Sequence, residues 1–208
     1  MIDWTITKQL APEKSGAFFY FYKMQITGII LAGGKSKRMG TDKAFIKFNK
    51  KTLLENSVEL LRPFCETILI SSNNSEHKIT ETKTVPDEIA DCGPIGGVYS
   101  CLKESKTDWN FVISVDSALV KLQFVKHLIS EIEDFDAVVP THSKGKEPLI
   151  ALYNKNCLFE IEKIIRSGDF KMLNLLNSIN TKWVDSQNWV EKYPKLFHNI
   201  NRPEDLEK

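Results

Sequence analysis

Short, mainly apolar runs alternate with amphipathic stretches along the first half of the chain. Residues 26–31 and 67–71 have the length and composition of buried strands, and residues 53–61 between them carry apolar side chains at helical spacing. Thr52 and Glu55 have the spacing of a capping box, which predicts that this helix begins directly after Thr52. A buried strand, a helix and a second buried strand in sequence indicate a parallel sheet with crossover helices.

The same alternation continues toward the C-terminus, although less regularly in the second half. We therefore expect an α/β fold, a three-layer sandwich with a mostly parallel, Rossmann-like central sheet. Further strands are predicted at residues 111–115, 137–139, 149–153 and 183–184, and further helices at residues 93–102, 122–132, 158–166 and 172–176.

The chain length bounds the number of domains. With 208 residues, of which 42% are hydrophobic, the chain is long enough for one sizeable domain and short for two. We predict a single domain over residues 24–208, preceded by a dispensable extension of residues 1–23, because Met24 stands just before the first strand. An alternative for the extension, whose residues 17–22 are mostly aromatic, is that it packs on the domain or on a second subunit.

Net charge and cysteine content restrict the partners and the compartment. A formal net charge of +1 gives no general attraction to nucleic acid or to acidic membranes, so we predict neither as a partner. Residues 17–22 are much shorter than the roughly 20 apolar residues that span a bilayer. The four cysteines lie far apart and lack the spacing of a zinc site, so we expect reduced thiols and a cytoplasmic protein.

A glycine-rich, basic segment follows the first predicted strand. Gly33 and Gly34 are adjacent, which lets the backbone come close to a ligand. Lys35, Arg38 and Lys43 follow, and their charges could surround a triphosphate. The segment has neither the Gly-Lys-Ser/Thr ending of a Walker A loop nor the glycine spacing of the dinucleotide fingerprint. A solvated basic turn is the alternative, but a strand, paired glycines, cations and an acidic residue together favour a nucleotide site.

Polar residues also follow other predicted strands, at the carboxyl ends where ligands bind in open α/β sheets. Asp116 comes directly after residues 111–115, and one aspartate is enough for a Mg²⁺ ion that also takes phosphate oxygens and waters. The alternative for Asp116 is a helix cap. Asn73 and Asp87 are either ordinary turn residues or contacts to the base or ribose of a nucleotide.

Four ordered motifs resemble those of the molybdenum cofactor guanylyltransferases, the MobA-type enzymes. The glycine-rich segment reads Gly-Gly-x-Ser-x-Arg-Met-Gly-x-Asp-Lys and ends at Lys43. The other three motifs are similar to the family's Pro-Asp and Gly-Pro-Leu-Ala-Gly segments, its Pro-Leu-Phe-Ala-Leu-Tyr strand and its closing Asn-x-Asn-x-Pro-Glu-Asp-Leu motif. They lie at residues 85–97, 147–153 and 197–206. The resemblance implies a nucleotide-diphospho-sugar transferase-like fold, with a GTP-binding N-terminal half and an acceptor-binding C-terminal half.

The reaction that the resemblance implies is transfer of GMP from GTP to the terminal phosphate of molybdenum-molybdopterin. Pyrophosphate is released and molybdopterin guanine dinucleotide is formed, with Mg²⁺ as the cofactor. The resemblance also implies transient contact with cofactor-biosynthesis proteins and molybdoenzyme chaperones. A phosphate monoester with a second pKa of about 6 is largely dianionic at neutral pH, so the acceptor needs no general base. We accordingly expect the four histidines to be surface or structural residues: His77, His127, His142 and His198.

The resemblance further assigns residues to the two substrates. Some would contact the guanine nucleotide through backbone groups, and others would contact its base, ribose or phosphates through side chains. The backbone contacts are Leu31, Ala32, Gly33 and Gly34; the base or ribose contacts are Asn73 and Asp87; Lys43 would contact the phosphates, and Asp116 would hold both Mg²⁺ and the phosphates. The residues that would face the pterin are Pro148, Asn199 and Asn201. Charge and position assign Arg38 to the departing pyrophosphate, so the expected catalytic residues are Arg38, Lys43 and Asp116.

One departure from the family pattern keeps other functions open. Where the family reads close to Pro-Cys-Asp-Met-Pro, this chain has Ser-Val-Asp-Ser-Ala at residues 114–118. The carboxylate is kept, but without the prolines the turn is less constrained, so the catalytic efficiency or the choice of acceptor could differ. The alternatives are a related CTP- or UTP-dependent nucleotidyltransferase and a GTP-binding domain without turnover.

Overall fold

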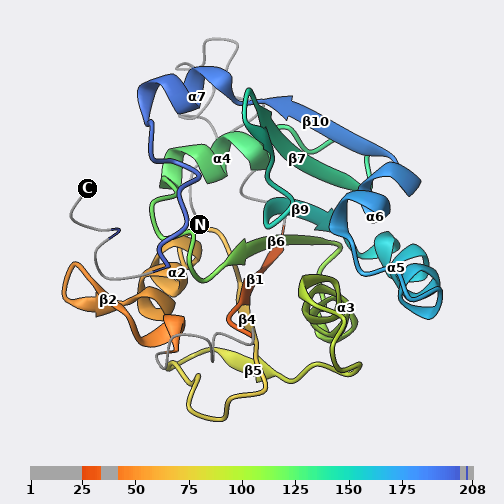
Figure 1. Cartoon of the computed structure of the whole chain (residues 1–208), viewed down its shortest axis with the longest axis horizontal. Helices are drawn as coiled ribbons and strands as arrows, with labels where there is room; N and C mark the ends of the chain where they lie inside the picture. The colour runs from red at the N-terminus through yellow and green to blue at the C-terminus, as the bar shows by residue number, and fades with distance from the viewer. Residues whose placement is uncertain (1–24, 34–41, 202–204, 206–208) are drawn as a thin grey trace, which may run out of the picture.

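The computed structural model describes residues 25–33, 42–201 and 205 (Figure 1). The expectations for residues 1–23, Gly34 and Arg38 fall outside the described residues. Within the described part, no helix has both the length and the apolar character needed to cross a membrane.

The described residues form strands and helices in an alternating order. The strands are β1 (Ile26–Leu31), β2 (Lys47–Phe48), β3 (Lys51–Thr52), β4 (Thr67–Ser71), β5 (Lys83–Val85), β6 (Trp109–Ser114), β7 (Ala137–His142), β8 (Gly145–Lys146), β9 (Ile150–Asn154) and β10 (Thr181–Asp185). The helices are α2 (Leu53–Leu61), α3 (Pro94–Glu104), α4 (Leu122–Ser130), α5 (Leu158–Arg166), α6 (Met172–Ser178) and α7 (Gln187–Lys192), with short 3-10 turns η3 (Lys43–Phe45) and η4 (Lys155–Cys157).

One eight-stranded sheet runs through the molecule in the order β10-β7-β9-β6-β1-β4-β5, with β8 paired to β7. The pairs β1–β4, β1–β6, β4–β5 and β7–β10 are parallel, which confirms the predicted mostly parallel sheet. The chain adds β4 and β5 on one side of β1 and then returns to add β6 on the other side. This reversal of strand order is the place where open α/β sheets bind their ligands.

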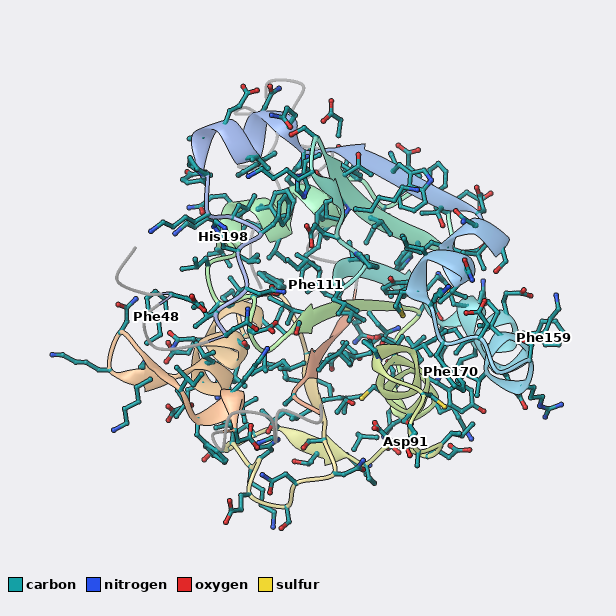
Figure 2. All side chains as sticks on the ribbon, viewed as in Figure 1. Phe48, Asp91, Phe111, Phe159, Phe170 and His198 are labelled. Carbon is teal, nitrogen blue, oxygen red and sulfur yellow. The ribbon has the colours of Figure 1, made fainter. Side chains whose placement is uncertain are left out.

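Helices cover both faces of the sheet, so the architecture is the predicted three-layer sandwich (Figure 1). One hydrophobic cluster joins α2 and α4 to one face, and Trp189 of α7 packs against it. A second cluster joins α3, α5 and α6 to the other face. Phe111 of β6 is fully buried in the first cluster and lies near the centre of the molecule, whereas Phe159 of α5 lies at the surface (Figure 2).

The capping box predicted at the start of α2 is present. The Thr52 hydroxyl accepts a hydrogen bond from the Glu55 backbone N–H at 3.1 Å, and the Glu55 carboxylate accepts one from the Thr52 backbone N–H at 2.6 Å. These bonds satisfy donors that a helix N-terminus leaves without intrahelical partners. The pKa of the Glu55 carboxyl is lowered because its charged form accepts hydrogen bonds from the Thr52 backbone N–H and from the Thr52 hydroxyl.

Strand register brings several loops to one edge of the sheet. Leu31 at the end of β1 lies opposite both Ser71 at the end of β4 and Ser114 at the end of β6. Val85 at the end of β5 lies opposite Ser71 in turn. Since β9 is antiparallel to β6, its first residue, Ile150, lies at this edge as well. We call this edge, with the loops that follow β1, β4, β5 and β6 and the loop that precedes β9, the carboxyl edge.

The structure contains elements that sequence periodicity did not predict. The strand β9 is antiparallel to both β6 and β7, and β5 and α7 are short elements without a predicted counterpart. The two-residue strands β2 and β3 form a separate hairpin. All four cysteines are free, and Cys92, Cys101 and Cys157 are buried.

Candidate functional site

A lysine and an aspartate that are far apart in sequence meet at the carboxyl edge. The Lys43 ammonium nitrogen Nζ donates hydrogen bonds to Asp116 Oδ2 at 3.0 Å and to Asn201 Oδ1 at 2.5 Å. The side chain of Lys43 is 28% exposed and that of Asp116 is 12% exposed. The three residues therefore bring a cation, a carboxylate and an amide together at the edge where the sheet order reverses.

Local structure directs Lys43 toward this place. The Asp42 carboxylate caps η3 by accepting a hydrogen bond from the Ala44 backbone N–H at 3.0 Å. Ala44 and Ile46 are buried in the core beside α2, which fixes the backbone that follows Lys43. Lys43 is the first residue of η3, so its side chain leaves a rigid turn and not a free loop.

Asp116 is held by the turn that follows β6. The Ser114 hydroxyl donates to Asp116 Oδ1 at 2.6 Å, and the Ser117 backbone N–H donates to the Ser114 carbonyl at 3.0 Å to close the turn. Asp116 as a whole residue is 8% exposed. The chain lacks prolines here, yet hydrogen bonds from two serines constrain the turn and orient the carboxylate.

The C-terminal segment packs onto this turn. The Ile200 backbone N–H donates to the Asp116 carbonyl at 2.8 Å, and Ile200 is buried in the core. On either side of it, Asn201 receives the Lys43 bond and Asn199 accepts a bond from the Ser117 hydroxyl at 3.4 Å. Asn199 and Asn201 are exposed; the Asn199 amide is bonded directly to the loop that carries Asp116, and the Asn201 amide is linked to Asp116 through Lys43.

A second polar pair, Asn73 and Asp87, lies at the same edge beyond β4 and β5. The Asn73 amide oxygen accepts from the Asp87 backbone N–H at 2.9 Å, and the Asn73 amide nitrogen donates to Asp87 Oδ2 at 3.4 Å. Ser71 Oγ donates to Asp87 Oδ1 at 3.3 Å. Burial raises the pKa of the Asp87 carboxyl, and the hydrogen bonds from Ser71 and Asn73 partly offset this rise.

The backbone that follows β1 is built into the sheet on both sides. The Leu31 carbonyl accepts from the Val115 N–H at 3.1 Å, and the Ala32 N–H donates to the Ser71 carbonyl at 3.0 Å. Leu31 and Ala32 are buried, whereas Gly33 is exposed. Two of the backbone groups at the predicted nucleotide contacts, the Leu31 carbonyl and the Ala32 N–H, are therefore already hydrogen-bonded within the chain.

The N-terminal half of α3 packs closely against β1 and β4. A Cβ atom at Gly97 would lie 2.3 Å from Ser71 Oγ and 3.2 Å from Leu31 Cδ2. A contact below 3.0 Å requires the neighbouring atom to shift, so a residue larger than glycine would displace the Ser71 hydroxyl. This close approach holds Ser71 where it can donate to Asp87.

Pro148 lies on the other side of β6, in the loop before β9. Its carbonyl accepts a hydrogen bond from the Tyr153 hydroxyl at 2.7 Å, and the carbonyl of the next residue, Leu149, accepts from the Ser114 N–H at 3.0 Å. Nearby, His142 Nε2 lies 2.9 Å from Glu147 Oε1, and the His142 ring stacks on Phe197 with ring centroids 4.8 Å apart. This region links the loop before β9 with the C-terminal segment.

The predicted site residues thus fall into two groups along one edge. Lys43, Asp116, Asn199 and Asn201 form one connected group, and Asn73 and Asp87 form the other. Leu31, Ala32 and Gly33 lie between the groups at the end of β1, and Pro148 lies beyond the first group next to β6. Figure 2 shows His198 on the C-terminal segment, close to α4.

Sequence reasoning missed the residues that support these groups. Ser114 orients Asp116. The sequence signal for this role was a hydroxyl side chain two residues before the carboxylate. His77 was predicted to be a surface or structural residue; it is 1% exposed and lies within hydrogen-bond distance of Asp42 and Ser72. No sequence pattern pointed to these partners.

The carboxylates of the described residues do not form a conventional metal cage. Within the described ranges, no group of three or more His, Cys, Asp or Glu side chains is placed to hold a metal ion. Among the described residues, Asp116 lies beside the Lys43 cation, which also binds the Asn201 amide. This arrangement fits a magnesium ion that takes one protein carboxylate and completes its shell with phosphate oxygens and waters.

Comparison with known proteins gives one consistent family. The model of the MobA-like NTP transferase domain matches residues 28–182. The chain is 32% identical over 191 residues to a probable molybdenum cofactor guanylyltransferase of Geobacillus sp. (strain WCH70), covering 88% of this chain and 97% of that protein. It is 33% identical to the molybdenum cofactor guanylyltransferase of Vibrio parahaemolyticus, with 88% and 93% covered.

A solved structure agrees with the relationship. The crystal structure of molybdopterin-guanine dinucleotide biosynthesis protein A from Archaeoglobus fulgidus superposes with a TM-score of 0.72 at 26% sequence identity. The match covers 87% of this chain and 95% of that chain. Both the sequence relationship and the fold therefore extend over most of the chain.

Proposed function

Because the chain belongs to the MobA-like NTP transferase family, we propose that it transfers GMP from GTP to the terminal phosphate of molybdenum-molybdopterin. Pyrophosphate is the leaving group, and molybdopterin guanine dinucleotide is the product. The observation that carries this proposal is the Lys43–Asp116–Asn201 cluster at the reversal of strand order. It unites the glycine-rich loop, the aspartate after β6 and the C-terminal asparagines, which lie in three separate motifs of the sequence.

The nucleotide occupies the β1–β4–β5 side of the edge in this proposal. Gly33 and Gly34, with the neighbouring Leu31 and Ala32, present backbone to the guanine nucleotide. The amide of Asn73 and the carboxylate of Asp87 are already hydrogen-bonded to each other, so they form a preorganised donor and acceptor pair for base or ribose. Preorganisation lowers the entropy that binding must offset.

The triphosphate lies over the Lys43 cluster. Lys43 exchanges its bond with Asp116 for bonds to phosphate oxygens, and Arg38 interacts with the departing pyrophosphate. Asp116, released from Lys43, would hold Mg²⁺. A bound Mg²⁺ ion would neutralise charge on the triphosphate and polarise its α-phosphorus. The Ser114 hydroxyl keeps the Asp116 carboxylate oriented while its partner changes.

The acceptor lies on the β6–β9 side, where Pro148, Asn199 and Asn201 face the pterin. An oxygen of its terminal phosphate attacks the α-phosphorus of GTP, and the bond from that phosphorus to the bridging oxygen of the β-phosphate breaks. No proton needs to be removed, because the phosphate monoester is mostly dianionic at neutral pH, with a second pKa of about 6. Rate acceleration rests on alignment of the two substrates and on neutralisation of charge in the transition state.

Cofactor-biosynthesis proteins and molybdoenzyme chaperones are proposed as transient partners. The product must pass to an enzyme that uses it, and the molybdenum-loaded acceptor must come from the preceding step. The chain itself would bind only GTP and molybdopterin or molybdenum cofactor as small-molecule substrates.

Thermal unfolding with different nucleotides tests the choice of base. At about 100 times its Kd, a ligand stabilises the folded state by about 2.7 kcal/mol, which corresponds to a rise in Tm of roughly 5–10 °C for a chain of this size. With Mg²⁺ present, GTP should give such a rise, and CTP, UTP and ATP should give much smaller ones. An equal or larger rise with CTP or UTP would favour the related cytidylyl- or uridylyltransferase reaction.

A further inference from the structure

A buried histidine outside the proposed substrate contacts connects the nucleotide loop to the sheet. The geometry assigns His77 the role of a positioning residue: it fixes Asp42 and thereby places the neighbouring Lys43 for the triphosphate. This inference rests on the proposed function, since Lys43 is the phosphate contact there. It concerns a residue that neither the motifs nor the substrate sites include.

Three side chains form a continuous hydrogen-bonded chain from β4 to η3. Ser72 Oγ lies 2.7 Å from His77 Nδ1, and His77 Nε2 lies 2.9 Å from Asp42 Oδ2. Ser72 is 3% exposed and His77 is 1% exposed. Buried polar groups need partners of this kind, because leaving one unsatisfied destabilises the folded state.

The direction of the bonds follows from the neighbours. The Asp42 carboxylate can only accept, so His77 carries its proton on Nε2 and donates it to Asp42. Nδ1 of the neutral ring then accepts from the Ser72 hydroxyl, whose oxygen accepts from the Asn74 backbone N–H at 3.0 Å. Each group donates to the next, and the chain ends on the carboxylate that caps η3.

This arrangement is not a hydrolytic Ser–His–Asp site. In such a site the serine is accessible to a substrate and its hydroxyl oxygen is available for attack. Here Ser72 is buried, and its oxygen already accepts the Asn74 bond. The chain of bonds therefore serves to hold Asp42 in place.

His77 itself is anchored from several directions. The Thr84 hydroxyl donates to the His77 carbonyl at 2.6 Å, and the His77 backbone N–H donates to the Asn74 carbonyl at 3.2 Å. The Phe45 ring meets the imidazole edge-on with centroids 5.2 Å apart. Since Thr84 lies in β5 and Phe45 lies in η3, His77 ties the sheet to the turn that carries Lys43.

Both carboxylate oxygens of Asp42 accept hydrogen bonds, and His77 helps to hold the carboxylate in place. Its Oδ1 atom accepts the Ala44 N–H that caps η3, while its Oδ2 atom accepts bonds from His77 and from the Asn74 amide at 3.2 Å. Among the described residues, loss of the imidazole leaves Oδ2 with the bond from the Asn74 amide alone. A displacement of about 1 Å in a group that contacts a reacting phosphate is enough to change catalysis strongly.

The test compares His77→Phe with His77→Gln. Phenylalanine keeps a ring against Phe45 but removes both hydrogen bonds, whereas glutamine can still donate toward Asp42. The Kd for GTP·Mg²⁺ by calorimetry and the KM for GTP should rise about tenfold in His77→Phe, which is the effect of about one lost hydrogen bond. They should stay within about threefold of wild type in His77→Gln, and the KM for the pterin acceptor should not change in either.

A purely structural role predicts a different result. It would lower Tm and the amount of active protein, and so the apparent kcat, while the Kd and KM for GTP stay at wild-type values. His127→Phe is the matched control, because His127 also packs against an aromatic ring, that of Trp189, but lies in α4. GTP binding in this control should equal that of wild type.

A double-mutant cycle identifies the route of the effect. If His77 acts through Asp42, then Asp42→Asn alone should weaken GTP binding, and adding His77→Phe should change the Kd by less than about twofold further. Independent, multiplying effects of the two substitutions on the Kd would overturn the inference, as would wild-type GTP binding in a folded His77→Phe variant. If wild type itself fails to bind GTP, the proposed function fails; if wild type binds GTP and the variants bind it equally well, only the role of His77 fails.

Discussion

Lys43 Nζ lies 3.0 Å from Asp116 Oδ2 although 73 positions separate the two residues in sequence. The bond joins the loop after β1 to the loop after β6, which are neighbours because β1 and β6 pair in parallel. Both side chains are partly buried, so each stabilises the charge of the other. In the proposed reaction, Lys43 exchanges this bond for bonds to phosphate oxygens, and Asp116 would hold Mg²⁺.

Replacement of the carboxylate tests its proposed metal role. Asp116→Ala should retain the fold, because the backbone carbonyl of residue 116 still accepts the Ile200 N–H and Lys43 keeps Asn201 as a partner. Magnesium-dependent turnover should fall by at least about 100-fold. Circular dichroism checks the fold and pyrophosphate release checks turnover; near-normal turnover would remove the metal role.

Replacement of the cation should act mainly on the nucleotide. Lys43→Ala removes one charge-assisted contact to phosphate, so kcat/KM for GTP should fall by about 10- to 100-fold. Steady-state kinetics with varied GTP measures this change. Lys47→Ala is the control, since Lys47 is exposed in the β2–β3 hairpin. Unchanged kinetics in Lys43→Ala would refute the phosphate contact.

Asp87 should oppose stability at neutral pH while serving nucleotide binding. Burial raises the pKa of the Asp87 carboxyl, so the folded state binds the carboxyl proton more tightly than the unfolded state does. Protonated Asp87 therefore stabilises the folded state at low pH, and this stabilisation is lost as the pH rises through the folded pKa. Asp87→Asn should therefore raise Tm slightly at pH 7. The gain should vanish below the ordinary aspartate pKa of 3.8, and GTP affinity should fall at pH 7.

Asp169 provides a control with the opposite sign. Hydrogen bonds from Asn174 and from the Lys171 backbone lower the pKa of its carboxyl, so its stabilisation is present above the ordinary pKa and is lost as the pH falls. Asp169→Asn should lower Tm at pH 7 and leave GTP affinity unchanged. Melting curves between pH 3 and pH 8 compare the two variants, and a drop in Tm at pH 7 for Asp87→Asn would contradict its assignment.

The contact between α3 and β4 should not tolerate a methyl group. Gly97→Ala places Cβ against Ser71 Oγ and Leu31 Cδ2, so we expect a loss of about 1–3 kcal/mol of stability and weaker GTP binding as Ser71 moves away from Asp87. Urea unfolding measures the stability. The double variant Gly97→Ala/Ser71→Ala should recover part of it, because the closest of the contacts is removed. Equal stability of Gly97→Ala and wild type would contradict this packing.

Much of the fold could be predicted because its signals are local. The strands β1 and β4 and the helix between them follow from apolar periodicity and from the Thr52–Glu55 capping box. Parallel pairing then places the ends of strands at one edge, which is why Gly33, Asp116 and Asn73 were expected near one another. The structure has all three at this edge.

Other features depend on contacts that periodicity does not encode. The direction of β9 is set by its pairing with both β6 and β7, and its apolar sequence reads the same in either direction. The strand β5 has three residues, which is too short for a periodic pattern. His77 finds Asp42 across 35 positions of sequence, and only the folded chain brings this pair together.

The account's central claim is tested most directly by the reaction itself. The purified chain is mixed with Mg²⁺, molybdenum-loaded molybdopterin and one nucleoside triphosphate at a time, and pyrophosphate and the dinucleotide are followed together. We predict that GTP gives pyrophosphate and molybdopterin guanine dinucleotide in equal amounts, and that Asp116→Ala gives neither. Two results would contradict this claim. One is formation of the cytosine or uracil dinucleotide in preference to the guanine dinucleotide, and the other is GTP binding by folded protein without any pyrophosphate release.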